Sequence, residues 1–78
     1  MPRYYFHVYD DEIACDDEGI ELPDQDAAIA EATSGARSLA CEQVLKGRLK
    51  LHHCVVVADD SGSEFATIRF RDVVAVEG

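Results

Sequence analysis

The residues best suited to metal chemistry stand together at His52-His53-Cys54. Imidazole nitrogens and thiolates are the preferred ligands of zinc. If this stretch is a strand, residues two apart point to the same face, so His52 and Cys54 converge. A closed site needs two further ligands, which folding would have to gather from His7, Cys15 or Cys41. No CxxC or HxxxH spacing supports such a site. The alternative is that Cys54 is a small core residue, one histidine tops the sheet and the other is solvated.

The rest of the chain offers no recognisable catalytic arrangement. Its glycines match no nucleotide-binding fingerprint, and no nucleophile elbow is present. No spacing links a serine and a histidine to an orienting acid. We therefore expect no catalytic residue and no cofactor, and His7, His52 and Cys54 remain the candidates for a small zinc-binding or enzymatic domain.

Charge narrows the class of partner. Sixteen acidic and seven basic residues give a net charge of −9, and no basic stripe with interleaved aromatics relieves it. Such a field repels phosphate backbones, so direct nucleic-acid binding is disfavoured. The acids concentrate between residues 1 and 26, where Arg3 is the sole basic residue. This end is either a solvated hairpin or a docking surface for a basic protein partner.

The apolar runs and the cysteines of the chain indicate its cellular compartment. The longest later apolar run, residues 54–58, is far too short to cross a bilayer, and the first residues show no cationic and apolar leader. Three cysteines are an odd number without framework spacing, which indicates reduced thiols. We expect a cytoplasmic protein without membrane contact, whose free thiols are mostly buried.

The elements that must position these side chains begin with an aromatic strand at residues 4–9. A polar turn leads to a short return at 13–15, a turn or bulge at 16–19 and an extended piece at 20–22. Asp24 then caps a helix that ends at Gly47. Small and apolar residues recur along it at helical spacing: Ile29, Ala32, Ala36, Leu39, Ala40 and Gln43. Gly35 in mid-helix predicts close approach of the helix to the sheet.

Two more strands, at residues 51–58 and 65–70, form a second hairpin around the polar turn at 59–63. The sum is one α+β domain over residues 1–78 with ββαββ order, a two-layer fold of a four-stranded antiparallel sheet with one helix packed on one face. A chain of this length forms only a small core, so self-association would add to its stability.

The sheet face away from the helix is the informative one. Alternation places Tyr5, His7 and Tyr9 on one side of the first strand, a row of aromatic rings with period two. Either a second copy of the chain covers this row, or the valines of residues 73–76 do. We expect a homodimer whose partner interface contains Tyr5, His7 and Tyr9.

Three segments together resemble a known family. They are the opening Met1-Pro2-Arg3-Tyr4-Tyr5-Phe6-His7-Val8, the central Asp17-Glu18-Gly19-Ile20-Glu21-Leu22-Pro23-Asp24 with its following alanines, and the late Phe70-Arg71-Asp72. The pattern is similar to a small alphaproteobacterial family, common in rhizobia, of stand-alone domains of unknown function. The resemblance covers essentially the whole chain and implies no catalytic or binding residue.

A narrower resemblance runs to HicB-like antitoxin domains. It rests on a hairpin, a glycine turn and Leu22-Pro23-Asp24 before an alanine-rich helix. The resemblance implies an acidic binder of a basic, RNA-binding partner, although the chain lacks an evident DNA-binding appendix. Our first interpretation is a small acidic bacterial protein-interaction or regulatory module without catalysis, and the antitoxin-like binder is the alternative.

Overall fold

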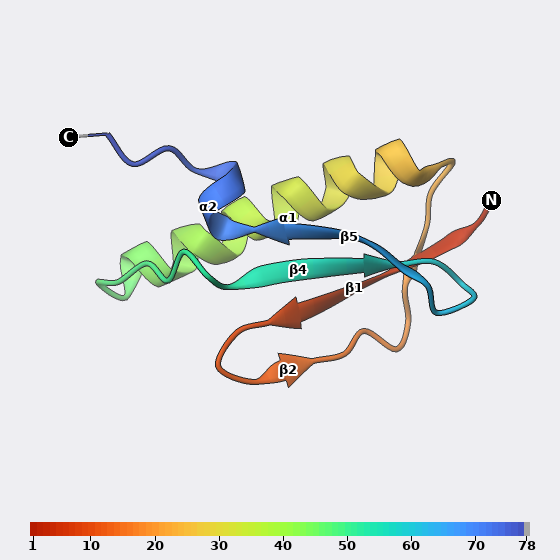
Figure 1. The fold of residues 1–78 in the computed structure, drawn as a ribbon, viewed down its shortest axis with the longest axis horizontal. Helices are drawn as coiled ribbons and strands as arrows, with labels where there is room; N and C mark the ends of the chain where they lie inside the picture. Colours follow the sequence, from red (N-terminus) through yellow and green to blue (C-terminus); the bar gives the residue numbers. More distant parts are fainter. Residues whose placement is uncertain (78) are drawn as a thin grey trace.

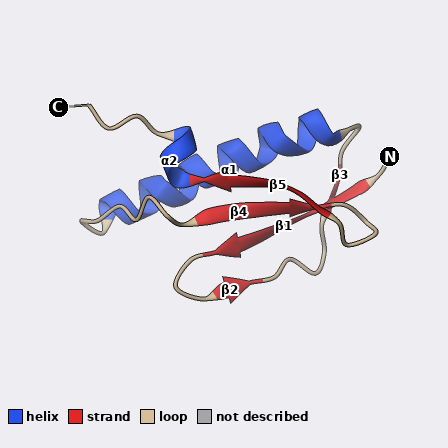
Figure 2. Ribbon diagram, in the orientation of Figure 1, coloured by secondary structure: helices blue, strands red, loops and turns tan. Residues whose placement is uncertain are grey.

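The amino-terminal aromatic stretch forms β1 (Arg3–Tyr9), an inner strand of an antiparallel sheet. The computed structural model describes residues 1–77. The sheet runs in the order β2-β1-β4-β5, and β3 also pairs with β1. The partners of β1 are β2 (Ile13–Ala14), β3 (Ile20–Glu21) and β4 (Cys54–Ala58), and β5 (Glu64–Arg69) forms the far edge. One long helix, α1 (Gln25–Leu45), lies across one face, so the α+β class is confirmed (Figures 1 and 2).

The sheet has five strands rather than the four expected, because the second strand is divided. β2 pairs with the end of β1 and β3 with its beginning. Between them the chain leaves the sheet, and the Asp16 carboxylate replaces the missing strand by accepting the Phe6 N–H at 3.1 Å. Gly19 makes the return possible with φ +69°, and a Cβ there would lie 2.8 Å from the Tyr4 carbonyl oxygen. Only glycine combines this conformation with this contact.

Helix α1 begins and ends where its local signals predict. The Asp24 side chain accepts the Ala27 N–H at 2.8 Å, which satisfies one of the free amides of the first turn. Lys46 is the C-cap, and Gly47 follows with φ +90°. Between these ends the helix presents a stripe of four buried alanines to the sheet: Ala28, Ala32, Ala36 and Ala40. Small side chains on this stripe let the helix lie close to the strands.

The core lies between that stripe and the strands. Val55 and Val57 of β4 are 3% and 0% exposed, and Tyr4 of β1 stacks edge-on against Phe65 at 5.8 Å. Phe70, 1% exposed, closes the same cluster from the start of α2 (Phe70–Val73). The main hydrophobic core therefore lies between α1 on one side and β4 on the other.

The second hairpin is shorter than predicted. Residues 51–53 form a turn before β4, although a strand was expected from residue 51. The backbone carbonyls of Leu51 and His53 accept the N–H groups of Arg71 and Phe70, so this turn pairs with α2 rather than with a strand. Phe70, expected at the end of the last strand, instead begins α2.

The valines after β5 pack on the helix side of the molecule. Val73 and Val74 pack against the core cluster, and the Val73 carbonyl accepts the Arg37 Nε–H at 3.0 Å. Arg37 belongs to α1, so this segment lies beside the helix (Figure 1). It does not cover the row of Tyr5, His7 and Tyr9, and that alternative is wrong.

The cysteines correct another expectation. Cys15 and Cys41 are exposed and Cys54 is half-buried, whereas mostly buried thiols were predicted. Cys15 follows the short strand β2 and Cys41 lies off the alanine stripe of α1, so neither reaches the core. All three thiols are free. Within residues 1–77, no helix has the length and apolar character that a bilayer span requires.

Candidate functional site

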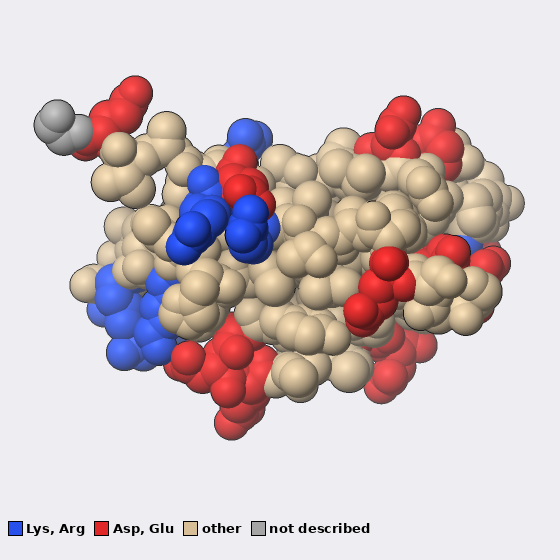
Figure 3. All heavy atoms as spheres, in the orientation of Figure 1, with Lys and Arg blue, Asp and Glu red and all other residues tan. Residues whose placement is uncertain are grey.

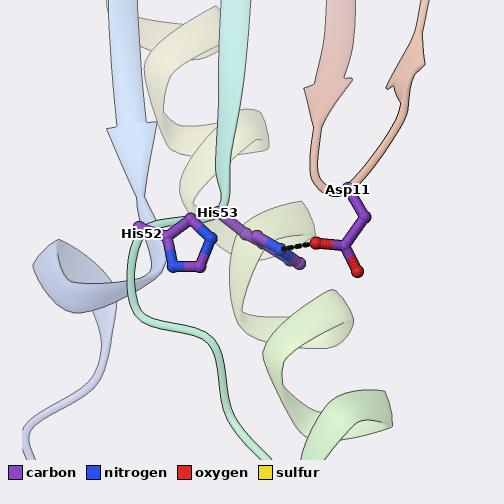
Figure 4. A group of neighbouring side chains, drawn as sticks. All are labelled: Asp11, His52 and His53. Atoms are coloured by element: carbon purple, nitrogen blue, oxygen red, sulfur yellow. Dashed lines mark ion pairs between the residues drawn. The ribbon is translucent and has the colours of Figure 1, made fainter.

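The structure gathers a different histidine cluster from the one predicted. Asp11, His52 and His53 place one ligand-type atom each within 4.8 Å of one another (Figure 4). Strand alternation was expected to unite His52 with Cys54, but His52 lies in the turn before β4, where alternation does not apply. His7 pairs with Val56 in mid-sheet and also lies outside the cluster.

His53 is the buried member of the cluster, with 3% of its surface exposed. Its ring meets that of Phe70 edge-on at 5.8 Å and that of His52 at 4.7 Å. A buried imidazole needs partners for its nitrogens, since an unpaired polar atom in the interior is costly. Nδ1 has a partner from α1, and the charged group nearest to Nε2 comes from the turn between β1 and β2.

The amide of Gln43 fixes the proton of His53. Its Oε1 accepts the Lys50 backbone N–H at 2.8 Å, which turns its Nε2 toward Nδ1 of His53 at 2.7 Å. An amide nitrogen can only donate, so Nδ1 accepts and the proton of the neutral ring lies on Nε2. Nε2 is buried and has no hydrogen-bond partner among the described residues; Asp11 Oδ1 lies 3.4 Å away.

This arrangement makes Nε2 a donor and not a ligand. A zinc ion requires the lone pair of the nitrogen that faces it. His53 could offer that lone pair at Nε2 only if the Gln43 amide reversed, which would bring an NH₂ group against the Lys50 N–H. The geometry therefore suits a hydrogen bond toward Asp11 or another acceptor, and it joins the β1–β2 turn to α1.

Asp11 holds the outer side of the cluster. Lys50 Nζ lies 2.8 Å from Asp11 Oδ2, and this hydrogen bond, with the charge of Lys50, holds the pKa of the Asp11 carboxyl below its ordinary value. The carboxylate is exposed and the pair is solvated, so it adds little stability by itself. Its role is to keep an anion next to His53.

A hollow of about 350 Å³ opens beside this cluster. Val8, Leu39, His53 and Phe70 are among its walls, and charged side chains of both signs surround them: Asp10, Asp11, Glu12, Glu42, Lys46, Arg48 and Lys50. Three of the seven basic residues of the chain thus line one hollow. On the face drawn in Figure 3, most basic side chains lie in the half of the molecule where α1 ends.

The predicted interface row lies on the sheet face opposite α1. Tyr5, His7 and Tyr9 lie opposite Ala58, Val56 and Cys54, respectively, in the register of β1 and β4. Paired residues share a face, and Val55 and Val57 point to α1, so this row points away from it. All three are half-buried.

Two members of the row are also tied to their neighbours. His7 Nδ1 accepts the Asp16 N–H at 3.0 Å, and the Tyr9 hydroxyl donates to Glu64 Oε2 at 3.3 Å. The negative charge of Glu64 raises the pKa of the Tyr9 hydroxyl. Next to them, burial raises the pKa of the Cys54 thiol despite the opposing charge of Arg69. The thiol is thus a weak nucleophile at neutral pH.

Sequence reasoning missed Asp11, Gln43 and Lys50 as members of the cluster. Gln43 carried the one available signal, because it is a polar residue at a position where the helical period expects an apolar one. A polar group on a buried face requires a partner. Nothing in the spacing of Asp11 and Lys50 indicated that they meet across the fold.

Comparison with known proteins supports the first of the two resemblances, to a family of domains of unknown function. No curated protein and no solved structure matches this chain. A family model described as Domain of unknown function (DUF6894) matches residues 3–71, from the first residue of β1 into α2. The chain therefore belongs to the DUF6894 family of domains of unknown function.

Proposed function

We propose that this domain is a non-catalytic protein-interaction module that forms a homodimer through the sheet face opposite α1. The observation that carries the proposal is the row of Tyr5, His7 and Tyr9, which neither α1 nor the carboxyl-terminal valines cover. Aromatic side chains are enriched at protein interfaces, where they contribute large apolar area with few rotatable bonds.

The neighbours of the row favour contact with another sheet. Val56 and Ala58 of β4 lie opposite the row in the sheet register, and on β5 the charged residues Glu64 and Arg69 are paired with the two ends of β4. Two such faces can pack about 10 Å apart around a two-fold axis, so that the same row serves both copies.

The cytoplasm is the compartment we propose for this activity. Cys15 and Cys41 are exposed and free, a state that a reducing compartment preserves.

Light scattering on the purified chain tests the dimer. We expect twice the chain mass of 8.6 kDa for the wild type at tens of micromolar and the monomer mass for the double variant Tyr5→Ser, Tyr9→Ser. As a matched control, Ser34→Ala and Ser38→Ala on the exposed side of α1 should leave the dimer intact.

A thermal melt shows whether the double variant still folds. A dimer also predicts that the Tm of the wild type rises with protein concentration, because association stabilises the folded state by mass action. A wild-type monomer with a concentration-independent Tm would refute the proposal, as would a folded double variant that remains dimeric.

A further inference from the structure

Helix α1 leaves part of the sheet uncovered on its own side. It packs against β4 and β5, and the valines of β4 beneath it are fully buried. Phe6 and Val8 of β1 point to the same face, yet both are only half-buried. The sheet is wider than one helix, and an apolar strip along β1 remains open beside α1.

That strip is hollowed. A cavity of about 210 Å³ has Phe6, Val8 and Val55 as its floor, Ile20 of β3 at one side, and Ala32, Gly35 and Leu39 of α1 at the other. It shares Val8 and Leu39 with the hollow of about 350 Å³ beside His53. The two hollows therefore adjoin, and we call them together the α1–β1 groove.

Gly35 shows that the groove is not closed by the fold itself. Close approach of helix and sheet was expected at this glycine, but a Cβ there would meet no atom within 4 Å. That expectation is wrong. A mid-helix glycine costs about 1 kcal/mol relative to alanine, and here no packing constraint within the monomer requires it. What it provides is a deeper wall on the groove.

The groove has the length for a helical segment. Its lining on α1 runs from Glu31 to Lys46, which at about 1.5 Å per residue is roughly 20 Å, or four turns of a second helix alongside the first. Amphipathic helices commonly bind in apolar grooves of this kind through residues at i, i+3, i+4 and i+7.

The charges of the lining residues indicate which charge an occupant of the groove should carry. Asp16 and Glu31 line the smaller hollow, and no basic residue does. Partial burial would raise the pKa of Asp16, but N–H donation from Gly19, Phe6 and Glu18 outweighs it, and the pKa lies below its ordinary value. The carboxylate is therefore ionised and held in place at neutral pH.

The larger hollow adds further acids and ends in a short basic stretch. Asp10, Glu12 and Glu42 line it, while Lys46 and Arg48 stand where α1 ends. Lys50 is paired with Asp11. Six acidic and three basic residues thus line the groove as a whole, so its charge is net negative, which complements apolar anchors flanked by lysine or arginine.

We propose that the α1–β1 groove binds a basic amphipathic helix of a partner protein. The site lies on the opposite face of the sheet from the proposed dimer interface, so it goes beyond that proposal and can fail or succeed independently of it.

A synthetic peptide tests the groove. The probe is a labelled 14-residue helix with leucine on one face and lysine elsewhere, titrated with the chain and followed by fluorescence anisotropy. We expect saturable one-to-one binding, weakened about tenfold or more by Gly35→Leu, whose side chain has room to enter the hollow. Ser34→Leu, at the exposed neighbouring position outside the hollow, is the matched control and should bind as the wild type does.

Peptide controls separate the groove from simple charge attraction. The same residues reordered to remove the apolar face, and the same peptide with glutamate for lysine, should both bind much more weakly. Equal binding of the reordered peptide, or undiminished binding to a folded Gly35→Leu variant, would refute the proposal.

Other occupants give distinct results. If n-octylammonium saturates the groove while the helical peptide does not bind, the site takes a small amphipathic cation and the proposal is wrong. If the wild type is a dimer in solution and the Gly35→Leu variant is a monomer, a second copy of the chain occupies the groove and the proposal is also wrong. The double variant Tyr5→Ser, Tyr9→Ser should bind the peptide normally, which keeps this test separate from that of the dimer.

Discussion

A single side-chain amide decides what His53 can do. Because Gln43 Oε1 accepts the Lys50 N–H, the NH₂ group of Gln43 must face the imidazole. The buried ring is thereby fixed as a donor at Nε2, next to the Asp11 carboxylate. Gln43 at the end of α1 and Asp11 in the β1–β2 turn thus lie on opposite sides of one buried ring.

This network predicts the position of a proton. In long-range ¹H–¹⁵N spectra at pH 8, His53 should show a protonated Nε2 and an unprotonated Nδ1. The variant Gln43→Leu removes the donor to Nδ1, so its His53 should sample both tautomers. A wild-type signal from a protonated Nδ1 would show that the amide is reversed and that Nε2 is free to bind a metal.

The elements were predictable where the signal is local. The Asp24 cap and the Gly47 stop bound α1 closely, because each acts through hydrogen bonds within a few residues. Interruptions that depend on distant contacts were not predictable. Residues 51–53 precede a run of valines that predicts a strand, but the carbonyls of Leu51 and His53 pair with the first N–H groups of α2. The division of β2 from β3 similarly depends on a carboxylate that reaches across to β1.

The site was less predictable than the fold. The prediction of the pair His52 and Cys54 rests on strand periodicity, which fails because the strand begins three residues later than expected. Gly35 was read correctly as an unusual residue, but the sign of its effect on packing depends on the position of α1 relative to β1. Helix placement over a sheet is a tertiary property that the periodicity of neither element contains.

Helix α1 gives a prediction of its own. Gly35→Ala should raise the free energy of unfolding by about 1 kcal/mol, since alanine is the better helix former and its Cβ meets nothing. For a domain of this size that gain corresponds to a Tm increase of roughly 4–8 °C, measurable by circular dichroism. Gly47→Ala is the comparison, and it should destabilise the fold because its φ is +90°. A lower Tm for Gly35→Ala would mean that the helix does approach the sheet there.

The whole molecule carries a charge of −9, yet several of its carboxylates have more favourable interactions in the folded state than in the unfolded one. Asp11 is stabilised by Lys50, Asp59 by the Ser61 hydroxyl and Asp72 by Arg69. In each case the hydrogen bond named lowers the pKa of the carboxyl. Local hydrogen bonds therefore oppose the general repulsion.

These lowered pKa values predict acid sensitivity. A folded state whose carboxyl pKa lies below the unfolded value of about 3.9 binds fewer protons than the unfolded chain. The stabilisation is present above that value and is lost as the pH falls through the folded pKa. Urea unfolding at pH 7, 4 and 2.5 should show the steepest loss in the last interval, and Asp16→Asn should reduce its slope. Equal stability at pH 4 and 2.5 would contradict this assignment.

The register of β1 with β4 has a consequence for the order of folding. Val8 lies opposite Val55, and α1 with both of its loops separates them. The inner strand β1 is made first and must therefore wait for a partner that is made only after α1, with its aromatic side chains uncovered in the meantime. Pairings between segments so distant in the chain are slow to form. We therefore expect the chain to depend on chaperones most strongly while its amino-terminal half has left the ribosome and β4 has not yet been made.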